Sequence, residues 1–182
     1  DRNDNGFFDV DDALWAAHEA AYPGGAAEGY GSANGSYGLY ITTLWGDNSG
    51  AFGYWLNNAS CWSLTDVVAD GDHLAAFIYQ DGVTYSDVYT KFDSFAYTAV
   101  ADTAFTVTLE QAGYDDSWNT VFTALAGAEI LAYDAEMKAV GSTGYTFTDL
   151  GNGSYSVRFT EAGDYYLVAT NSDMLIVPAV CE

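Results

Sequence analysis

Positive charge is nearly absent from this chain. Its 182 residues include only 4 Lys and Arg residues against 26 Asp and Glu residues, which gives a formal net charge of -22. Such a polyanion repels nucleic acid and anionic membrane surfaces, so the sequence predicts neither as a partner. The same charge attracts divalent cations. An acidic surface that only keeps the chain soluble is the alternative explanation.

Cysteine and long apolar runs are scarce as well. Only Cys61 and Cys181 occur, and their separation matches no zinc or redox motif. One disulfide between them and two buried thiols are both compatible with the sequence. No apolar run approaches the roughly 20 residues of a membrane-spanning helix, so we expect no membrane insertion. The first residues carry no signal-peptide pattern, and we expect a fragment of a longer secreted protein.

Motifs that would indicate catalysis are missing too. The only histidines are His18 and His73, and we expect each to be a packing or surface residue rather than a general base. Neither a Gly-x-Ser-x-Gly nor a His-Glu-x-x-His element occurs. The aspartate pairs at 11–12 and 115–116 have the composition of a glycosidase dyad, but nothing places two carboxylates across a cleft. The sequence therefore predicts that the protein is not an enzyme.

The apolar residues that are present favour a folded, sheet-rich chain. Hydrophobic residues make up 49% of the sequence and aromatic residues 16%, which is enough for a core and suits strands. A single helix is predicted over residues 9–21, because apolar residues recur there at helical spacing and Pro23 follows. The spaced residues are Val10, Ala13, Leu14, Ala17 and Ala21.

The rest of the sequence alternates between strands and turns. We predict a mainly β fold with one helix: an α+β domain at residues 1–92 and an immunoglobulin-like β-sandwich at residues 93–182. In the first domain, strands are expected at Tyr37–Trp45, Ala51–Leu56 and His73–Tyr79. In the second, they are expected at Phe95–Val100, Phe105–Leu109, Glu129–Tyr133, Tyr145–Phe147, Ser154–Phe159, Tyr165–Ala169 and Met174–Val177.

The first twelve residues have the spacing of a calcium-binding loop. Oxygen-bearing side chains stand at loop positions 1, 3, 5, 9 and 12, with glycine at position 6 and a helix after the loop. A hard cation needs six or seven oxygen ligands, and glycine permits the sharp bend. We expect Phe8 to turn into the core. The predicted Ca²⁺ ligands are the side chains of Asp1, Asn3, Asn5, Asp9 and Asp12 and the backbone carbonyl of Phe7.

The loop sequence has an alternative interpretation, and it resembles known calcium loops only in part. A metal-free, Asp- and Asn-rich turn that caps a helix would have a similar sequence. As a loop, it is EF-hand-like, and the aspartate at position 12 resembles dockerin-type loops. No second loop of this kind is found, so binding of a dockerin partner does not follow. We expect a structural rather than a switching role for calcium, because one continuous loop fixed to a helix mainly rigidifies that corner.

Three segments of the first domain carry a family resemblance. They are residues 12–20, residues 37–46, and the aromatic segment 52–58 with the turn and strand at 70–74. Residues 9–92 resemble a domain family of surface proteins of Gram-positive gut bacteria, which is related in fold to the C-terminal β-domain of transcobalamin and intrinsic factor. Residues 93–182 resemble the immunoglobulin-like domain often attached to it. The resemblance implies an extracellular, cell-surface location. Family members usually have a strand before the helix, whereas this chain begins at the loop.

Aromatic residues of the first domain suggest a second hypothesis for the function, ligand binding. Trp45, Tyr54, Trp55 and Trp62 could stack on a glycan or on a corrinoid, the latter implied by the kinship with cobalamin carriers. The alternative is that they fill a small core. We therefore predict a calcium-stabilised structural or adhesive module whose partners are neighbouring domains or subunits of a surface assembly, such as a stalk or filament. Glycan binding through these aromatic residues is the alternative function.

Overall fold

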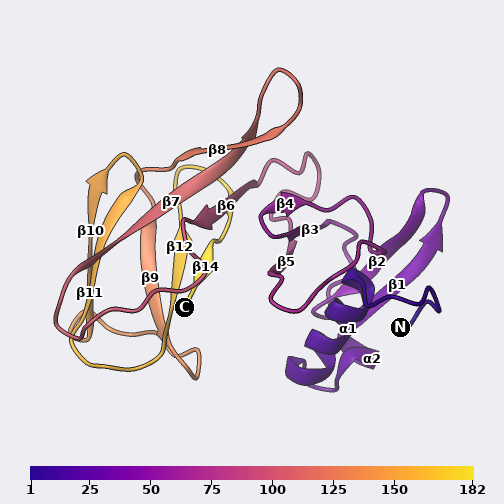
Figure 1. The fold of residues 1–182 in the computed structure, drawn as a ribbon, viewed down its shortest axis with the longest axis horizontal. Helices are drawn as coiled ribbons and strands as arrows, with labels where there is room; N and C mark the ends of the chain where they lie inside the picture. Colours follow the sequence, from indigo (N-terminus) through magenta and orange to yellow (C-terminus); the bar gives the residue numbers. More distant parts are fainter. The chain divides into compact units, whose positions relative to one another are not determined.

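The computed structural model describes residues 1–182, and its secondary structure is mainly β, with 14 strands and two helices. The mainly β prediction is confirmed. The chain divides into two compact units, Asp1–Ser86 and Asp87–Glu182 (Figure 1). The division falls before the expected boundary at residue 92, because strand β6 (Val88–Phe92) pairs with β7 (Phe105–Tyr114) of the second unit. Neither helix is long and apolar enough to cross a membrane.

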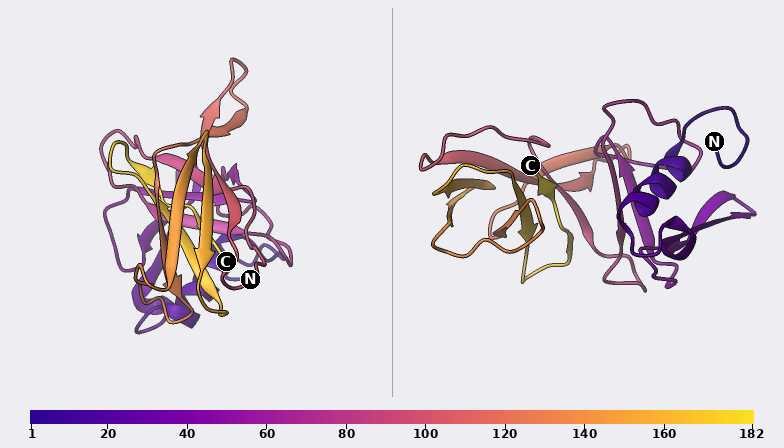
Figure 2. Two further views of the ribbon diagram at one scale, coloured as in Figure 1. Left: turned by 90° about the vertical axis from the view of Figure 1, so that its left-hand side faces the viewer. Right: turned by 90° about the horizontal axis from the view of Figure 1, so that it is seen from below.

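The first unit contains both helices and two small sheets. Helix α1 follows the N-terminal loop, which begins beside its first turn (Figure 2). The bounds are α1 Val10–Ala21, α2 Ala26–Gly29, β1 Tyr30–Gly35, β2 Gly38–Leu44, β3 Phe52–Leu56, β4 Ala59–Ser60 and β5 Leu74–Ile78. β1 and β2 form an antiparallel hairpin, and the other sheet has the order β4-β3-β5. The core of this unit lies where α1, the β1–β2 hairpin and the segment around Leu64 meet. Its buried residues are Val10, Leu14, Tyr30, Ile41, Leu44 and Leu64.

The helix prediction is confirmed, but its buried face is rotated. Val10, Leu14 and His18 are buried at four-residue spacing, whereas Ala17 and Ala21 are exposed. The His18 side chain has no exposed surface. Its Nδ1 donates to the carbonyl of Leu14 (2.6 Å), and its Nε2 accepts from the backbone N–H of Trp45 (3.0 Å). His18 thus ties the end of α1 to the turn after β2, which is a packing role as expected.

The second unit is a β-sandwich with the strand order of an immunoglobulin constant-type domain. One sheet has the order β10-β11-β7-β6, and the other β14-β12-β9, which corresponds to the ABED and CFG sheets of that fold. β13 adds in parallel to β6, and β8 pairs with β7 alone. The remaining bounds are β8 Thr120–Ala124, β9 Glu129–Asp134, β10 Tyr145–Gly151, β11 Ser154–Phe159, β12 Tyr165–Thr170, β13 Ile176–Val177 and β14 Val180–Cys181.

Both sheets of the sandwich contribute to one core. Val107, Leu109 and Val157 face it from the larger sheet, and Ile130 and Leu167 from the smaller one. One strand was predicted wrongly. Phe95–Val100 is not a strand, and the first strand of the sandwich is β6 instead. The segment is irregular apart from two backbone hydrogen bonds with the last residue of the chain: the Tyr97 N–H donates to the Glu182 carbonyl, and the Glu182 N–H donates to the Phe95 carbonyl.

The two cysteines are free, so the disulfide considered from the sequence is not formed. The physical reason is the place of Cys181. It lies on β14 with its side chain in the sandwich core, 2% exposed, and it therefore faces its own unit. Cys61 lies in the first unit and is half-buried. Burial raises the pKa of both thiols, that of Cys181 to about 12, with nearby aspartates adding to the rise.

The burial difference predicts unequal thiol reactivity. With a disulfide-exchange reagent at pH 8, we expect one equivalent of thiol to react in the native protein and a second only after denaturation. Cys61→Ser should abolish the native reaction, and Cys181→Ala should leave it intact. Two thiols that react at equal rates in the native protein would contradict the burial of Cys181. No reaction even in denaturant would indicate a disulfide.

Candidate metal centre

The N-terminal loop is closed by its own first residue. The Asp1 carboxylate accepts hydrogen bonds from the backbone N–H groups of Asn5 (3.0 Å) and Gly6 (2.7 Å). Gly6 has φ +85°, a left-handed conformation that favours glycine, and this confirms the bend expected at that position. The chain therefore returns toward Asp1 within six residues and brings the later loop positions above the start of α1.

Three of the predicted ligand side chains converge on one point. Asp9 is fully buried, and its Oδ2 accepts hydrogen bonds from Nδ2 of Asn3 and from Nδ2 of Asn5, both at 2.7 Å. Rotation of a terminal amide by 180° exchanges its nitrogen and oxygen atoms. In this structure the amide oxygens face other donors: that of Asn3 accepts from the Asn5 N–H (3.2 Å) and that of Asn5 from the Phe7 N–H (2.8 Å). Such a rotation would exchange these two hydrogen bonds for amide oxygens beside the Asp9 carboxylate. Positions 3, 5 and 9 are brought together as the spacing predicts.

Asp12 lies at the first turn of α1 and is engaged mainly with backbone groups. It forms a capping box with Asp9: the Asp9 side chain accepts from the Asp12 N–H, and the Asp12 side chain accepts from the Asp9 N–H. Its other oxygen accepts from the Arg2 N–H at 2.7 Å. Burial acts to raise the pKa of Asp12, but the hydrogen bonds from Arg2 and Asp9 outweigh it, and the pKa is lowered. Asp12 is therefore an anionic helix cap with both oxygens occupied.

The two phenylalanines of the loop do not enter the core. Phe7 is 60% exposed and Phe8 is 51% exposed, so the expectation that Phe8 turns inward is wrong. Its backbone carries the contact instead, because the Phe8 carbonyl accepts from the Val68 N–H at 3.0 Å. The segment 64–68 also accepts the first two N–H groups of α1: that of Val10 at the Asp66 carbonyl (3.0 Å) and that of Asp11 at the Leu64 carbonyl (2.9 Å). The segment holds the loop and the helix together.

Arg2 anchors the loop from the other side, and sequence reasoning missed this role. Its guanidinium carbon lies 4.0 Å from the ring centre of Trp15, and its Nη1 lies 3.0 Å from Oδ2 of Asp11. The Tyr30 hydroxyl donates to the other Asp11 oxygen at 2.8 Å. Asp11 is thereby fully paired and separate from the ligand set. The available signal was a lone arginine within an acidic loop.

The donor set fits a hard cation, although no carboxylate cluster is formed. The proposed ligands offer only oxygen atoms, which suit Ca²⁺ and not zinc or copper. No group of three or more His, Cys, Asp or Glu side chains is placed to share an ion. The six proposed ligands include three carboxylates, Asp1, Asp9 and Asp12, so the full set is not gathered around one point in this structure. Asn3, Asn5 and Asp9 converge, whereas the Asp1 and Asp12 carboxylates accept from backbone N–H groups. When bound, the ion would supply electrostatic cross-linking of the loop.

The four aromatic residues proposed for ligand binding do not form one exposed surface. Trp55 is 6% exposed and Tyr54 packs against the first core, so neither presents a free ring face, and the expected platform is wrong in this respect. Trp45 is 43% exposed, but its ring lies 4.0 Å from that of His18. Trp62 is 93% exposed. The strand β3 alternates between its faces, which explains why neighbouring aromatic residues diverge.

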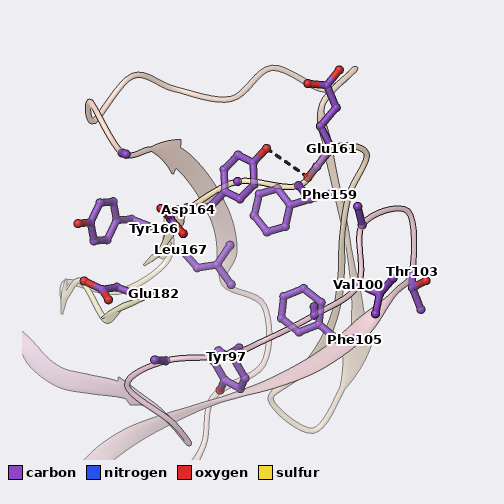
Figure 3. Close-up of a pocket in the computed structure, with 17 residues that line it drawn as sticks. Tyr97, Val100, Thr103, Phe105, Phe159, Glu161, Asp164, Tyr166, Leu167 and Glu182 are labelled. Atoms are coloured by element: carbon purple, nitrogen blue, oxygen red, sulfur yellow. Dashed lines mark hydrogen bonds between the residues drawn. The ribbon is translucent and has the colours of Figure 1, made fainter.

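A cavity of about 500 Å³ opens in the second unit beside β12 (Figure 3). Tyr97 and Phe105 line one side of it and Phe159 another, with Leu167 between them. Its size is that of a small-molecule site. The hydroxyl of Tyr97 donates to Asp93, so this ring presents its face rather than a free polar edge. The ionisable lining side chains other than tyrosine are acidic: Glu161, Asp164 and Glu182.

Comparisons with known proteins add no relative. No protein-family model, no curated protein and no solved structure matches the chain. The site is therefore interpreted from its own geometry.

Proposed function

We propose that the protein is a calcium-stabilised, non-enzymatic module of an extracellular bacterial surface protein, with a structural or adhesive role. The observation that carries the proposal is the convergence of Asn3, Asn5 and Asp9 at the buried cap of α1. The loop that supplies these side chains has the spacing of a calcium loop and is closed by Asp1. The family resemblance noted in the sequence is part of the same proposal.

The proposed role of the metal is to fix one corner of the first unit. The loop contacts α1 through the cap, and it contacts the segment 64–68 through the Phe8 carbonyl. An ion bound only by the native loop stabilises these contacts by RT ln(1 + [Ca²⁺]/Kd), about 2.7 kcal/mol when calcium exceeds Kd a hundredfold. Extracellular calcium, at millimolar concentration, can saturate even a weak site of this kind.

The partners that fit the proposal are neighbouring domains or subunits rather than polyanions. A net charge of -22 opposes association with nucleic acid and with anionic membrane. The immunoglobulin-type sandwich of the second unit is an architecture shared by many cell-surface domains. Glycan or corrinoid binding by the first-unit aromatic residues, the alternative function, loses support because Trp55 is buried.

Asp1→Asn tests the calcium proposal most cleanly. The Asn5 and Gly6 N–H groups bond to different oxygens of Asp1, and an asparagine oxygen can still accept from one of them. We therefore expect a small loss of stability in chelator, while the charge that attracts the ion is lost. In 2 mM calcium, the melting temperature of the wild-type first unit should exceed its value in chelator by roughly 10 °C. A tenfold loss of affinity in Asp1→Asn would reduce this gain by about half, since it is worth about 1.4 kcal/mol.

The matched control is Asp70→Asn. This substitution makes the same charge change at an exposed aspartate of the same unit that is not one of the proposed ligands. Its calcium response should equal that of the wild type, both in melting temperature and in titration calorimetry. The proposal fails if the wild type melts at the same temperature with calcium and with chelator, or if both variants lose the response equally.

A further inference from the structure

The strands β7 and β8 form a ribbon that extends past the rest of the second unit. β7 pairs with β11 through residues 105–108 and with β6 through residues 109–111. β8 pairs with β7 from Glu110 to Tyr114, and beyond Gln111 it is the only partner of β7 (Figure 1). The end of this ribbon therefore adds nothing to the sandwich core. Phe122 of this part packs against Tyr89 and Lys91 of β6, whereas the side chains at the tip are exposed.

Two aromatic rings stand at the tip of the ribbon. Tyr114 is 56% exposed and Trp118 is 83% exposed, with ring centres 6.2 Å apart and planes inclined by 47°. Trp118 has φ +64°, in the left-handed region that costs a bulky residue of order 1–3 kcal/mol. Glycine would occupy this position without strain. The turn therefore holds a large ring in solvent at a cost to its own stability.

The backbone of the turn is organised without help from the Trp118 ring. The Asp115 carboxylate accepts from the backbone N–H groups of Ser117 (2.8 Å) and Asn119 (2.9 Å) and from the Asn119 amide (2.9 Å). Hydrogen bonds from the Asn119 side chain and backbone lower the pKa of Asp115, so this brace is anionic at neutral pH. The rings are therefore carried on a braced turn, and little backbone conformational entropy remains to be lost when a ligand binds.

The chemistry of the tip selects a class of ligand. Trp and Tyr rings offer flat apolar faces with a polar edge, and they dominate binding surfaces for that reason. Asp116 and Ser117 are exposed in the same turn, and their side-chain oxygen atoms can accept hydrogen bonds from hydroxyl groups. Residues 112–124 contain no Lys, Arg or His, so an anionic ligand is opposed. A neutral sugar combines an apolar C–H face with hydroxyl donors, and it matches each of these features.

We propose that the Tyr114–Trp118 tip of the β7–β8 ribbon is a binding site for neutral glycans. The inference names a ligand class for the adhesive role proposed above and rests on that role, but it does not depend on calcium. It moves the glycan site from the first unit, where sequence reasoning placed it, to the second. Individual contacts of this kind are weak, and repeated copies of the module on a surface would raise the avidity.

The test uses Trp118→Gly, which removes the ring and relieves the backbone strain. Its second unit should be as stable as the wild type or slightly more so, so that lost binding cannot be attributed to unfolding. The full chain, displayed as a tetramer, is applied to an array of immobilised neutral oligosaccharides of glucose, mannose, galactose and N-acetylglucosamine and to their sulfated counterparts. We expect binding to at least one neutral class, weaker binding to its sulfated form, and at least a tenfold loss in Trp118→Gly.

Two controls separate this proposal from the others. Trp62→Ala removes another highly exposed tryptophan, in the first unit, and should bind as the wild type does. Chelation of calcium should leave glycan binding unchanged, so a failure of the calcium proposal does not affect this result. The proposal is overturned if no neutral glycan is bound, if sulfated forms are bound better, if Trp118→Gly binds normally, or if Trp62→Ala loses binding equally.

Discussion

Asp9→Ala is expected to destabilise the first unit by about 2 kcal/mol in chelator and by about 4 kcal/mol in saturating calcium. Asp9 is fully buried and acts as the N-cap of α1, where its carboxylate accepts from the Asp12 N–H. Alanine removes this cap, and it also leaves the Asn3 and Asn5 amides without their shared acceptor. The further loss in calcium is the binding free energy that the native loop would no longer gain.

Asp9→Asn separates the two effects. Asparagine is as good an N-cap as aspartate, so in chelator this variant should keep the bond from the Asp12 N–H and lose less stability than Asp9→Ala. The remaining loss comes from the oxygen shared by the Asn3 and Asn5 amides, which an amide nitrogen replaces. The variant lacks the negative charge, so its stabilisation by calcium should be reduced. Urea titrations followed by tryptophan fluorescence measure the first unit selectively, because four of the five tryptophans lie there: Trp15, Trp45, Trp55 and Trp62. Equal losses for both variants in calcium and in chelator would mean that Asp9 is only a helix cap.

The features that sequence reasoning predicted well are local ones. The helix over Val10–Ala21 and the bend at Gly6 depend on neighbouring residues and on side chains within a few positions. The spacing of the loop predicted six ligands around one ion, and of these Asn3, Asn5 and Asp9 lie together in the structure. It could not show that the oxygens of Asp12 are taken up by backbone N–H groups, because the same aspartate serves equally well as a cap.

The features that were missed depend on contacts between distant segments. His18 was expected only to pack or to lie at the surface, and its bond to the Trp45 N–H spans 27 residues. The first strand of the sandwich was placed at Phe95–Val100, a short segment rich in aromatic and apolar residues. Whether this segment or β6 becomes the first strand depends on pairing with β7. In the structure, Lys91 pairs with Glu110 and Phe92 pairs with Leu109. No pattern within a single segment contains that information.

Exposure of aromatic residues was the least predictable property. Tyr54 and Trp55 are adjacent on β3, and the sequence alone does not tell which faces of a strand are covered. Sequence reasoning did not single out Trp118, and it weighed the aspartates at 115–116 only as a catalytic dyad. The structure shows that Asp115 braces the turn that exposes Trp118. The Trp118 ring is exposed because it stands in the turn at the end of the β7–β8 ribbon.

Alkaline solution is expected to destabilise the second unit strongly, beginning near pH 9. Burial, aided by Asp93, raises the pKa of the Cys181 thiol from 9.0 to about 12, and burial raises that of Tyr89 from 10.0 to about 12. Below pH 9 both groups are protonated in the folded and unfolded chains, and their contribution to stability is fully present. Between pH 9 and 12 the unfolded chain releases these protons while the folded chain retains them, so stability falls. For Cys181 alone, the loss by pH 11 is roughly 2–3 kcal/mol.

Cys181→Ala identifies the thiol's share of this loss. The variant should be less stable at pH 8, because a core side chain is shortened. Its stability should then stay level until about pH 10, where Tyr89 begins to contribute, whereas that of the wild type falls from about pH 9. Urea titrations followed by circular dichroism between pH 8 and 11 measure the difference, in a Cys61→Ser background that excludes the other thiol. Parallel pH profiles for the two chains would show that the Cys181 thiol titrates alike in both states. Its place between the sheets would then not be closed to water, because a thiolate is retained there only if solvent reaches it.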